Sequence, residues 1–189
     1  ALGGADALWA NRRFVKVGGE SNPKAVAGAI AHQTRAGQPP VILASGSHSI
    51  NQSIKAIAIC RGYLQDDGVD ISAQPEFRES HGTAVSFDIE KSKRISKVIP
   101  STEDLKVAGT SDPNIVAGAI AGKIRGSSRV TLQAIGPSSV LHAVEAIAIA
   151  RRYLENDGLD IRFRSEFIEV VFQDGVRNAI RFSLLLLQV

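Results

Sequence analysis

Residues 16–31 have the sequence KVGGESNPKAVAGAIA, and residues 106–121 have the sequence KVAGTSDPNIVAGAIA. The two stretches are copies of one pattern at an offset of 90 residues. The offset holds without a gap as far as Phe77 and Phe167, and 28 of the 62 pairs aligned in this way are identical. Self-similarity at a fixed period indicates a duplicated structural unit. We therefore divide the 189 residues into a leading segment 1–13, a first unit 14–90, a linker 91–104 and a second unit 105–189.

Each copy predicts the same order of secondary structure. A short strand precedes Asn22-Pro23 and Asp112-Pro113, where an Asn or Asp side chain at the cap and a proline at the first helical position begin a helix. A second strand then leads to a glycine and to a second helix, whose apolar residues in the first unit recur at spacings of three and four. Alternating residues predict a closing hairpin. The sequence therefore predicts an α+β protein of two β-α-β-α-β-β units, each a four-stranded mixed sheet with two helices on one face.

Three stretches of the second unit resemble a known family: SDPNIVAGAIAG at 111–122, QAIG at 133–136 and AVEAIAIAR at 143–151. They resemble stage V sporulation protein S, a small bacterial family with an Alba-like fold, and NQSIKAIAICRG at 51–62 resembles it in the first unit. The resemblance implies that each unit is an Alba-like module. Alba-like modules pair into dimers that bind DNA or RNA without strong sequence preference. The tandem could therefore form its own pseudo-dimer, or its units could pair with those of another chain.

In the Alba pattern, the loop between the second strand and the second helix carries basic residues toward the nucleic acid. The matching loops here are SGSHS at 45–49 and IGPSS at 135–139, and neither contains Lys or Arg. Serine, histidine and backbone N–H groups at a helix N-terminus can still receive a phosphate. The nucleic-acid-binding candidates around these loops are Gly46, Ser47, His48, Ser49, Asn51, Lys55, Gly136, Ser138, Ser139 and His142.

The net charge of +3, with an isoelectric point near 9.2, is an average over unlike parts. Residues 14–90 carry 6 basic and 8 acidic side chains, or −2, whereas residues 105–189 carry 10 and 8, or +2. The linker also carries +2, from 4 basic and 2 acidic side chains. Non-specific affinity for nucleic acid comes mainly from neutralised phosphates. We therefore expect a polyanion to bind the second unit and the linker, whose basic residues are Lys91, Lys93, Arg94 and Lys97.

Period-two alternation in the second unit predicts a basic sheet face turned away from the helices. Ile161, Phe163, Ile180 and Phe182 would face the helices. The opposite face would then carry the remaining nucleic-acid-binding candidates, with Lys16 as the counterpart in the first unit: Lys106, Arg162, Arg164, Arg177 and Arg181. The alternative is a solvated face on which these arginines pair across strands with Glu166 or Asp174.

Several other classes of protein are not favoured by the sequence. One cysteine, Cys60, cannot form an internal disulfide, and no apolar run comes near the roughly 20 residues of a membrane-spanning helix. The histidines lack metal-ligand spacing, so we expect no metal site and no cofactor. Adjacent Ser47 and His48 are rarely positioned as nucleophile and base, so we expect no catalysis. The chain contains no methionine, which indicates that its natural start has been removed or that the sequence is a fragment. The sequence does not identify the compartment: we expect a soluble protein, either cytoplasmic or organellar after removal of a targeting peptide.

Two functional hypotheses follow. The first is a non-catalytic, tandem Alba-like pseudo-dimer that binds nucleic acid with little sequence specificity. The second is a structural subunit of a larger protein or ribonucleoprotein assembly, in which the Alba-like units serve as protein-interaction scaffolds. The acidic first unit, the loops without lysine and the apolar tail 182–189 favour this second hypothesis.

Overall fold

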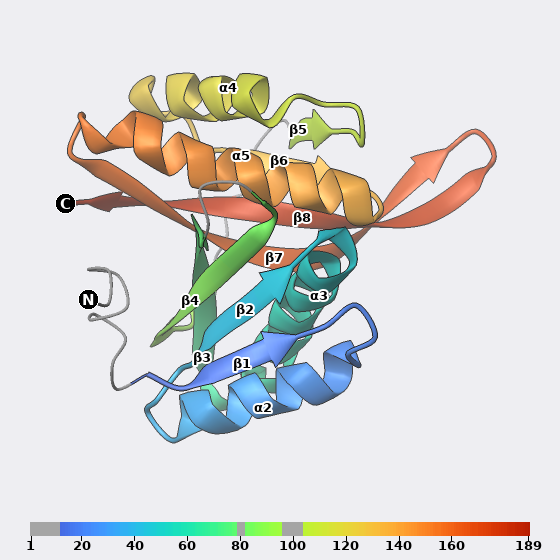
Figure 1. Cartoon of the computed structure of the whole chain (residues 1–189), viewed down its shortest axis with the longest axis vertical. Helices are drawn as coiled ribbons and strands as arrows, with labels where there is room; N and C mark the ends of the chain where they lie inside the picture. Colours follow the sequence, from blue (N-terminus) through green and yellow to red (C-terminus); the bar gives the residue numbers. More distant parts are fainter. Residues whose placement is uncertain (1–11, 79–81, 96–103) are drawn as a thin grey trace.

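The computed structural model describes residues 12–78, 82–95 and 104–189 (Figure 1). The first unit contains β1 (Phe14–Val17), α2 (Pro23–Arg35), β2 (Val41–Ser45), α3 (Ser47–Tyr63), a short 3-10 turn (Gln65–Asp67), β3 (Val69–Phe77) and β4 (Ala84–Lys93). The second unit contains β5 (Asp104–Val107), α4 (Pro113–Arg125), β6 (Thr131–Ala134), α5 (Pro137–Glu155), β7 (Leu159–Phe172) and β8 (Gly175–Gln188). The predicted α+β class and the predicted order of elements in both units are confirmed.

The strands of the two units form one eight-stranded sheet in the order β1-β2-β4-β3-β7-β8-β6-β5. Within each unit the first two strands are parallel and the others are antiparallel. The units join through β3 and β7, which pair antiparallel at Ala73 and Phe163. These two residues are equivalent in the repeat. A pseudo-twofold axis therefore relates the units at this joint, and the two units pair with each other.

The duplicated cap sequences account for where the first helix of each unit begins. The Asn22 side-chain oxygen accepts from the N–H groups of Lys24 and Ala25 at 2.9 and 3.3 Å. The Asp112 carboxylate accepts from the N–H of Asn114 at 2.8 Å. Each cap is followed by proline at the start of the helix, where the missing N–H would have had no partner within the helix. These contacts confirm the predicted helix starts.

One hydrophobic core runs through both units beneath the helices. The ring of Phe163 lies edge-on to Phe87 of the first unit, with centroids 6.2 Å apart, and to Phe182 of its own unit at 5.3 Å. All three rings are fully buried, and α3 packs against α5 across the joint. Burial of an aromatic side chain of this size contributes about 1.5–3 kcal/mol. The core therefore binds the units together in addition to the strand pairing.

Two features distinguish the closing hairpins of the units. Strand β4 continues to Lys93, so the first three residues of the segment expected as a linker lie in a strand. The hairpin of β7 and β8 is longer than its counterpart and projects from the body of the molecule, at the right of Figure 1.

Among the described residues, no helix is both long enough and apolar enough to cross a membrane.

Candidate nucleic-acid interface

The candidate loops lie where the parallel strands of each unit end. Since β1 and β2 run parallel, the turns that follow them meet at one edge, and a side-chain carbon at Gly19 would come within 3.3 Å of His48 Cβ. The second unit repeats the arrangement, since a side-chain carbon at Gly109 would come within 3.4 Å of Ser138 Cβ. In Figure 1, β1 and β5 point to the right, and α2, α4 and α5 begin on that side, from which the β7–β8 hairpin also projects. The structure thus groups several helix N-termini on one side of the molecule.

Helices α3 and α5 begin without a side-chain cap. Gly46 and Gly136 stand at the cap positions with φ of 87° and 86°, a backbone conformation that glycine adopts readily and other residues rarely do. Neither helix has a side-chain acceptor for its first N–H groups, in contrast to α2 and α4. Unsatisfied N–H groups together with the helix dipole favour a bound anion. Two sites with this property therefore occupy corresponding places in the two units.

The side chains around these helix starts differ in their accessibility. His48 and Ser138 are exposed, and Ser47 lies half-buried with its hydroxyl 3.4 Å from His48 Nδ1. His142 is half-buried with Nδ1 3.4 Å from the carbonyl oxygen of Ala108. Three candidates are buried and cannot contact a ligand without rearrangement: Ser49, Asn51 and Ser139.

The two units differ one turn further into the second helix. Lys55 is half-buried in α3, and Glu145 occupies its place in α5. Burial raises the pKa of the Glu145 carboxyl, with the nearby His142 acting in the opposite direction. The corresponding positions of the two second helices therefore carry a cation in the first unit and an acid in the second. The two sites therefore differ in charge, and they differ also in one backbone donor, because Pro137 at the start of α5 has no N–H.

The prediction of a basic open sheet face in the second unit is wrong for its central arginine. Arg162 is only 4% exposed, because it lies at the joint between the units. Its guanidinium donates to the Ser72 hydroxyl at 2.9 Å and to the carbonyl oxygens of Ser72 and Asp88, and it lies 3.5 Å from the Glu90 carboxylate. The predicted alternation itself is correct, since Ile161 and Phe163 are buried on the opposite face. The sequence did not reveal that the first unit covers this part of the sheet.

Arg164 is also held at the joint rather than presented to solvent. Its Nε lies 3.2 Å from the Asp70 carboxylate of the first unit, and it donates to the Ser92 hydroxyl at 3.1 Å. Burial alone would raise the pKa of Asp70, but the hydrogen bond and charge of Arg61, together with the charge of Arg164, hold it below its ordinary value. Asp70 is therefore a charged group at the joint, and Arg164 is one of its partners.

The two arginines of β8 are paired as well. Arg181 contacts Asp104 at 3.1 Å and Glu166 at 3.6 Å, while Arg177 contacts Asp174 at 2.9 Å and lies over the Phe172 ring at 4.7 Å. These contacts correspond to the alternative in which the arginines pair with neighbouring acids.

The candidate lysines of the strands remain exposed but are not gathered at one place. Lys16 and Lys106 are exposed on β1 and β5, which are the two outer strands of the sheet. Lys91 and Lys93 are exposed at the end of β4, whereas Arg94 is half-buried. Lys97 lies outside the described residues. Within the described residues, these four lysines therefore lie on three separate strands and do not form a single basic face.

A symmetric pair of arginines at the joint was missed by the sequence reasoning. Arg61 of α3 binds Asp70 with two hydrogen bonds of 2.8 and 3.1 Å and donates to the carbonyl of Ser165 in the other unit at 3.0 Å. Arg151 of α5 binds Asp160 at 2.9 and 3.2 Å and donates to the carbonyl of Pro75 at 2.9 Å. Both the Arg and the Asp recur at the offset of 90 residues. The recurrence of the two residues together is the signal in the sequence that could have identified the pair.

Comparison with known families agrees with this architecture. A family model described as Stage V sporulation protein S matches residues 13–92 and again residues 103–186. The two matches coincide with the two structural units and begin 90 residues apart.

Proposed function

The chain belongs to the stage V sporulation protein S family as a tandem duplication of its unit, and from this premise we propose that it is a non-catalytic protein that binds DNA or RNA with little sequence specificity. The observation that carries the proposal is the uncapped start of α3 and of α5 at Gly46 and Gly136. Backbone N–H groups there can receive phosphate oxygens. Contacts of this kind position a nucleic acid but read no base.

The charge distribution supports weak and moderately salt-dependent binding. Arg162, Arg164 and Arg181 are engaged by acids of the chain itself, so they are not available to neutralise phosphates. Exposed Lys16 and Lys106 remain as nearby cations, because they lie on β1 and β5, which pair in parallel with β2 and β6, the strands that lead to the helix starts. We expect about two to four phosphate contacts. A plot of the logarithm of the binding constant for duplex DNA against the logarithm of the salt concentration should then have a slope of about −2 to −4.

A charge placed at the two helix starts tests the proposal. Fluorescence anisotropy would follow binding of labelled duplex DNA and single-stranded RNA at low salt to the unmodified chain and to a double variant, Ser47→Asp with Ser138→Asp. An acid in the first turn of a helix is favourable for the helix dipole, so the variant should fold normally. Its carboxylates would compete with phosphate for the same N–H groups, and we expect roughly tenfold weaker binding.

The matched control adds the same charge at the other ends of helices. Ser128→Asp with Asn156→Asp places two acids beyond the carboxyl ends of α4 and α5, and both positions are exposed. This control should bind nearly as the unmodified chain does. Absence of binding to both nucleic acids at low salt, or an equal loss in the control and in the test variant, would refute the proposal.

A second function, as a structural subunit of a larger assembly, is supported by the projecting β7–β8 hairpin. Its outer part exposes apolar side chains, with Val171 79% and Val176 59% accessible. Exposed apolar clusters are typical of protein contacts. Analytical ultracentrifugation of the chain in native extracts tests this function, because the subunit should sediment in a larger complex. The double variant Val171→Asp with Val176→Asp should no longer enter the complex, so the chain should sediment as a monomer. A native chain that sediments as a free monomer would exclude this function.

A further inference from the structure

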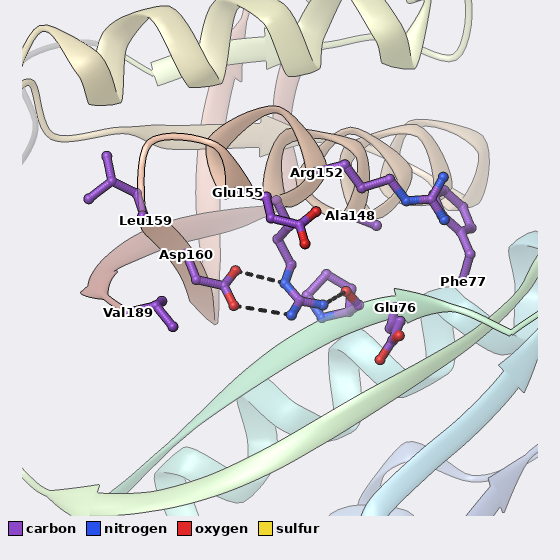
Figure 2. Close-up of a pocket in the computed structure, with 11 residues that line it drawn as sticks. Glu76, Phe77, Ala148, Arg152, Glu155, Leu159, Asp160 and Val189 are labelled. Carbon is purple, nitrogen blue, oxygen red and sulfur yellow. Dashed lines mark hydrogen bonds and ion pairs between the residues drawn. The ribbon is translucent and has the colours of Figure 1, made fainter. Parts of the chain in front are cut away.

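A pocket of about 400 Å³ lies where the second unit meets β3 of the first. The carboxyl-terminal part of α5 and the start of β7 form one wall, and residues 75–77 form the other. Figure 2 shows Leu159, Asp160 and Val189 at one end of the pocket, Arg152 and Phe77 at the opposite end, and Glu155 between them. The pocket adjoins the carboxyl-terminal end of α5, away from the start of that helix.

The internal repeat identifies what occupies the equivalent place in the first unit. The N–H of Arg94 donates to the Gly68 carbonyl at 2.9 Å, and the N–H of Val189 donates to the Gly158 carbonyl at 3.0 Å. Gly68 and Gly158 are equivalent in the repeat, so Arg94 and Val189 occupy equivalent positions. The first unit therefore has an arginine side chain where the second has the short side chain of valine at the edge of its pocket.

The contacts of Arg94 define a guanidinium site. Its Nε donates to the Val69 carbonyl at 3.2 Å, one terminal nitrogen donates to the Arg61 carbonyl, and the same nitrogen lies 3.8 Å from the Asp70 carboxylate. The equivalent groups in the second unit are the carbonyls of Leu159 and Arg151 and the carboxylate of Asp160, and all three residues line the pocket.

The pocket also carries more negative charge than the Arg94 site. It is lined by three acids and two arginines, for a net charge of −1, and Glu155 stands where the first unit has the neutral Gln65. Both arginines are already engaged, Arg151 by Asp160 at 2.9 Å and Arg152 over the Phe77 ring at 5.3 Å. Glu155 is exposed and has no ion pair within the described part of the chain. A cationic group entering the pocket would therefore meet an uncompensated carboxylate.

We propose that this pocket binds the guanidinium group of an arginine side chain presented by a polypeptide partner. The planar fork of donors would reach the carbonyls of Arg151 and Leu159 and the Asp160 carboxylate, as Arg94 does in the first unit. Glu155 would supply the additional charge. The pocket is open to solvent on one side, which leaves room for the chain that carries the arginine.

Titration of the full chain with blocked amino acids tests the proposal. N-acetyl-arginine methylamide, its neutral isostere with citrulline and the lysine analogue would be followed by isothermal calorimetry and by NMR chemical shifts. The arginine compound should bind roughly tenfold more tightly than either analogue. A pentapeptide Gly-Gly-Arg-Gly-Gly and free arginine distinguish a polypeptide source from a small molecule, because a polypeptide ligand should bind at least as well as the free amino acid.

Three variants test whether the binding lies in this pocket. Val189→Arg should fill the pocket with an internal guanidinium and abolish binding, while Arg94→Val should open the equivalent site and raise the stoichiometry from one to two. Glu155→Gln changes an exposed residue and should weaken binding several-fold without loss of stability. Equal affinity for the citrulline isostere, or unchanged binding by the Val189→Arg variant with a normal unfolding transition, would overturn the proposal.

Discussion

Replacement of Asp70 by asparagine should destabilise the protein more than any comparable change of a surface acid. The Asp70 side chain is 6% exposed and accepts two hydrogen bonds from Arg61, while Arg164 and Arg94 lie 3.2 and 3.8 Å away. Asparagine keeps the shape, and its oxygen can still accept from the N–H of Ile71, as Asp70 does at 2.8 Å. The substitution therefore removes the charge and leaves three guanidiniums near one another without a counter-ion.

The magnitude follows from the burial of the partners. Removal of one member of a buried ion pair costs about 3–5 kcal/mol because an uncompensated charge remains. For a domain of this length, 1 kcal/mol corresponds to about 2–4 °C in the melting temperature, so the Asp70→Asn variant should melt about 6–20 °C below the unmodified chain. Asp67 provides the matched control, because its pair with Arg35 also measures 2.8 Å but leaves these side chains 43% and 50% exposed. Asp67→Asn should cost less than about 1 kcal/mol.

Asp160 gives a second comparison within the same repeat. Its side chain is 24% exposed, and its partners are Arg151 and the neutral Gln74. Asp160→Asn leaves one guanidinium unpaired instead of three, so its effect should fall between those of the other two variants. Urea unfolding followed by circular dichroism gives all three free energies. Equal losses for Asp70→Asn and Asp67→Asn, or a larger loss for Asp160→Asn, would refute the role assigned to the arginine cluster.

Three further predictions concern the hydrophobic core, the stability of the protein at low pH and the reactivity of the Cys60 thiol. Phe163→Ala should lower the free energy of unfolding, measured in urea titrations, by about 3–5 kcal/mol. The same substitution at the half-exposed Phe167 should lower it by less than about 1 kcal/mol. Similar losses for the two variants would contradict a shared core at the joint. Because Asp70 and Asp104 have folded pKa values below the ordinary value of 3.8, they stabilise the folded state above that pH. The free energy of unfolding, measured between about pH 6 and pH 2, should fall as pH drops below about 4, and a flat profile would exclude the linkage. Burial raises the pKa of Cys60 to about 12, so a thiol reagent at about pH 8 should modify it only on unfolding; rapid modification in the absence of urea would show that the thiol is accessible.

The sequence was sufficient for everything that depends on local pattern. Caps at Asn22 and Asp112 and the repeated glycines located the helices, and alternation assigned Phe163 and Arg162 to opposite faces of the sheet. It could not show which strands meet between the units, since a single residue pair, Ala73 with Phe163, defines that contact. The accessibility of Arg162 depends entirely on this contact. For that reason the sequence predicts correctly which face of the sheet carries Arg162, but it does not predict that this side chain is buried.

The differences between the two copies at the joint are explained by their pairing within one chain. In a dimer of identical units, equivalent positions across the axis carry the same residue, and an arginine at both Ser72 and Arg162 would bring two guanidiniums together. Arg162 instead donates to Ser72, its own equivalent, at 2.9 Å, and its other partners, the Asp88 carbonyl and the Glu90 carboxylate, also come from the first unit. In the same way, Arg164 of the second unit pairs with Asp70 of the first unit. The −2 of the first unit and the +2 of the second are thus partly the two sides of one interface. The charge difference between the units therefore contributes to their pairing, and only the cations outside the joint remain for an external polyanion.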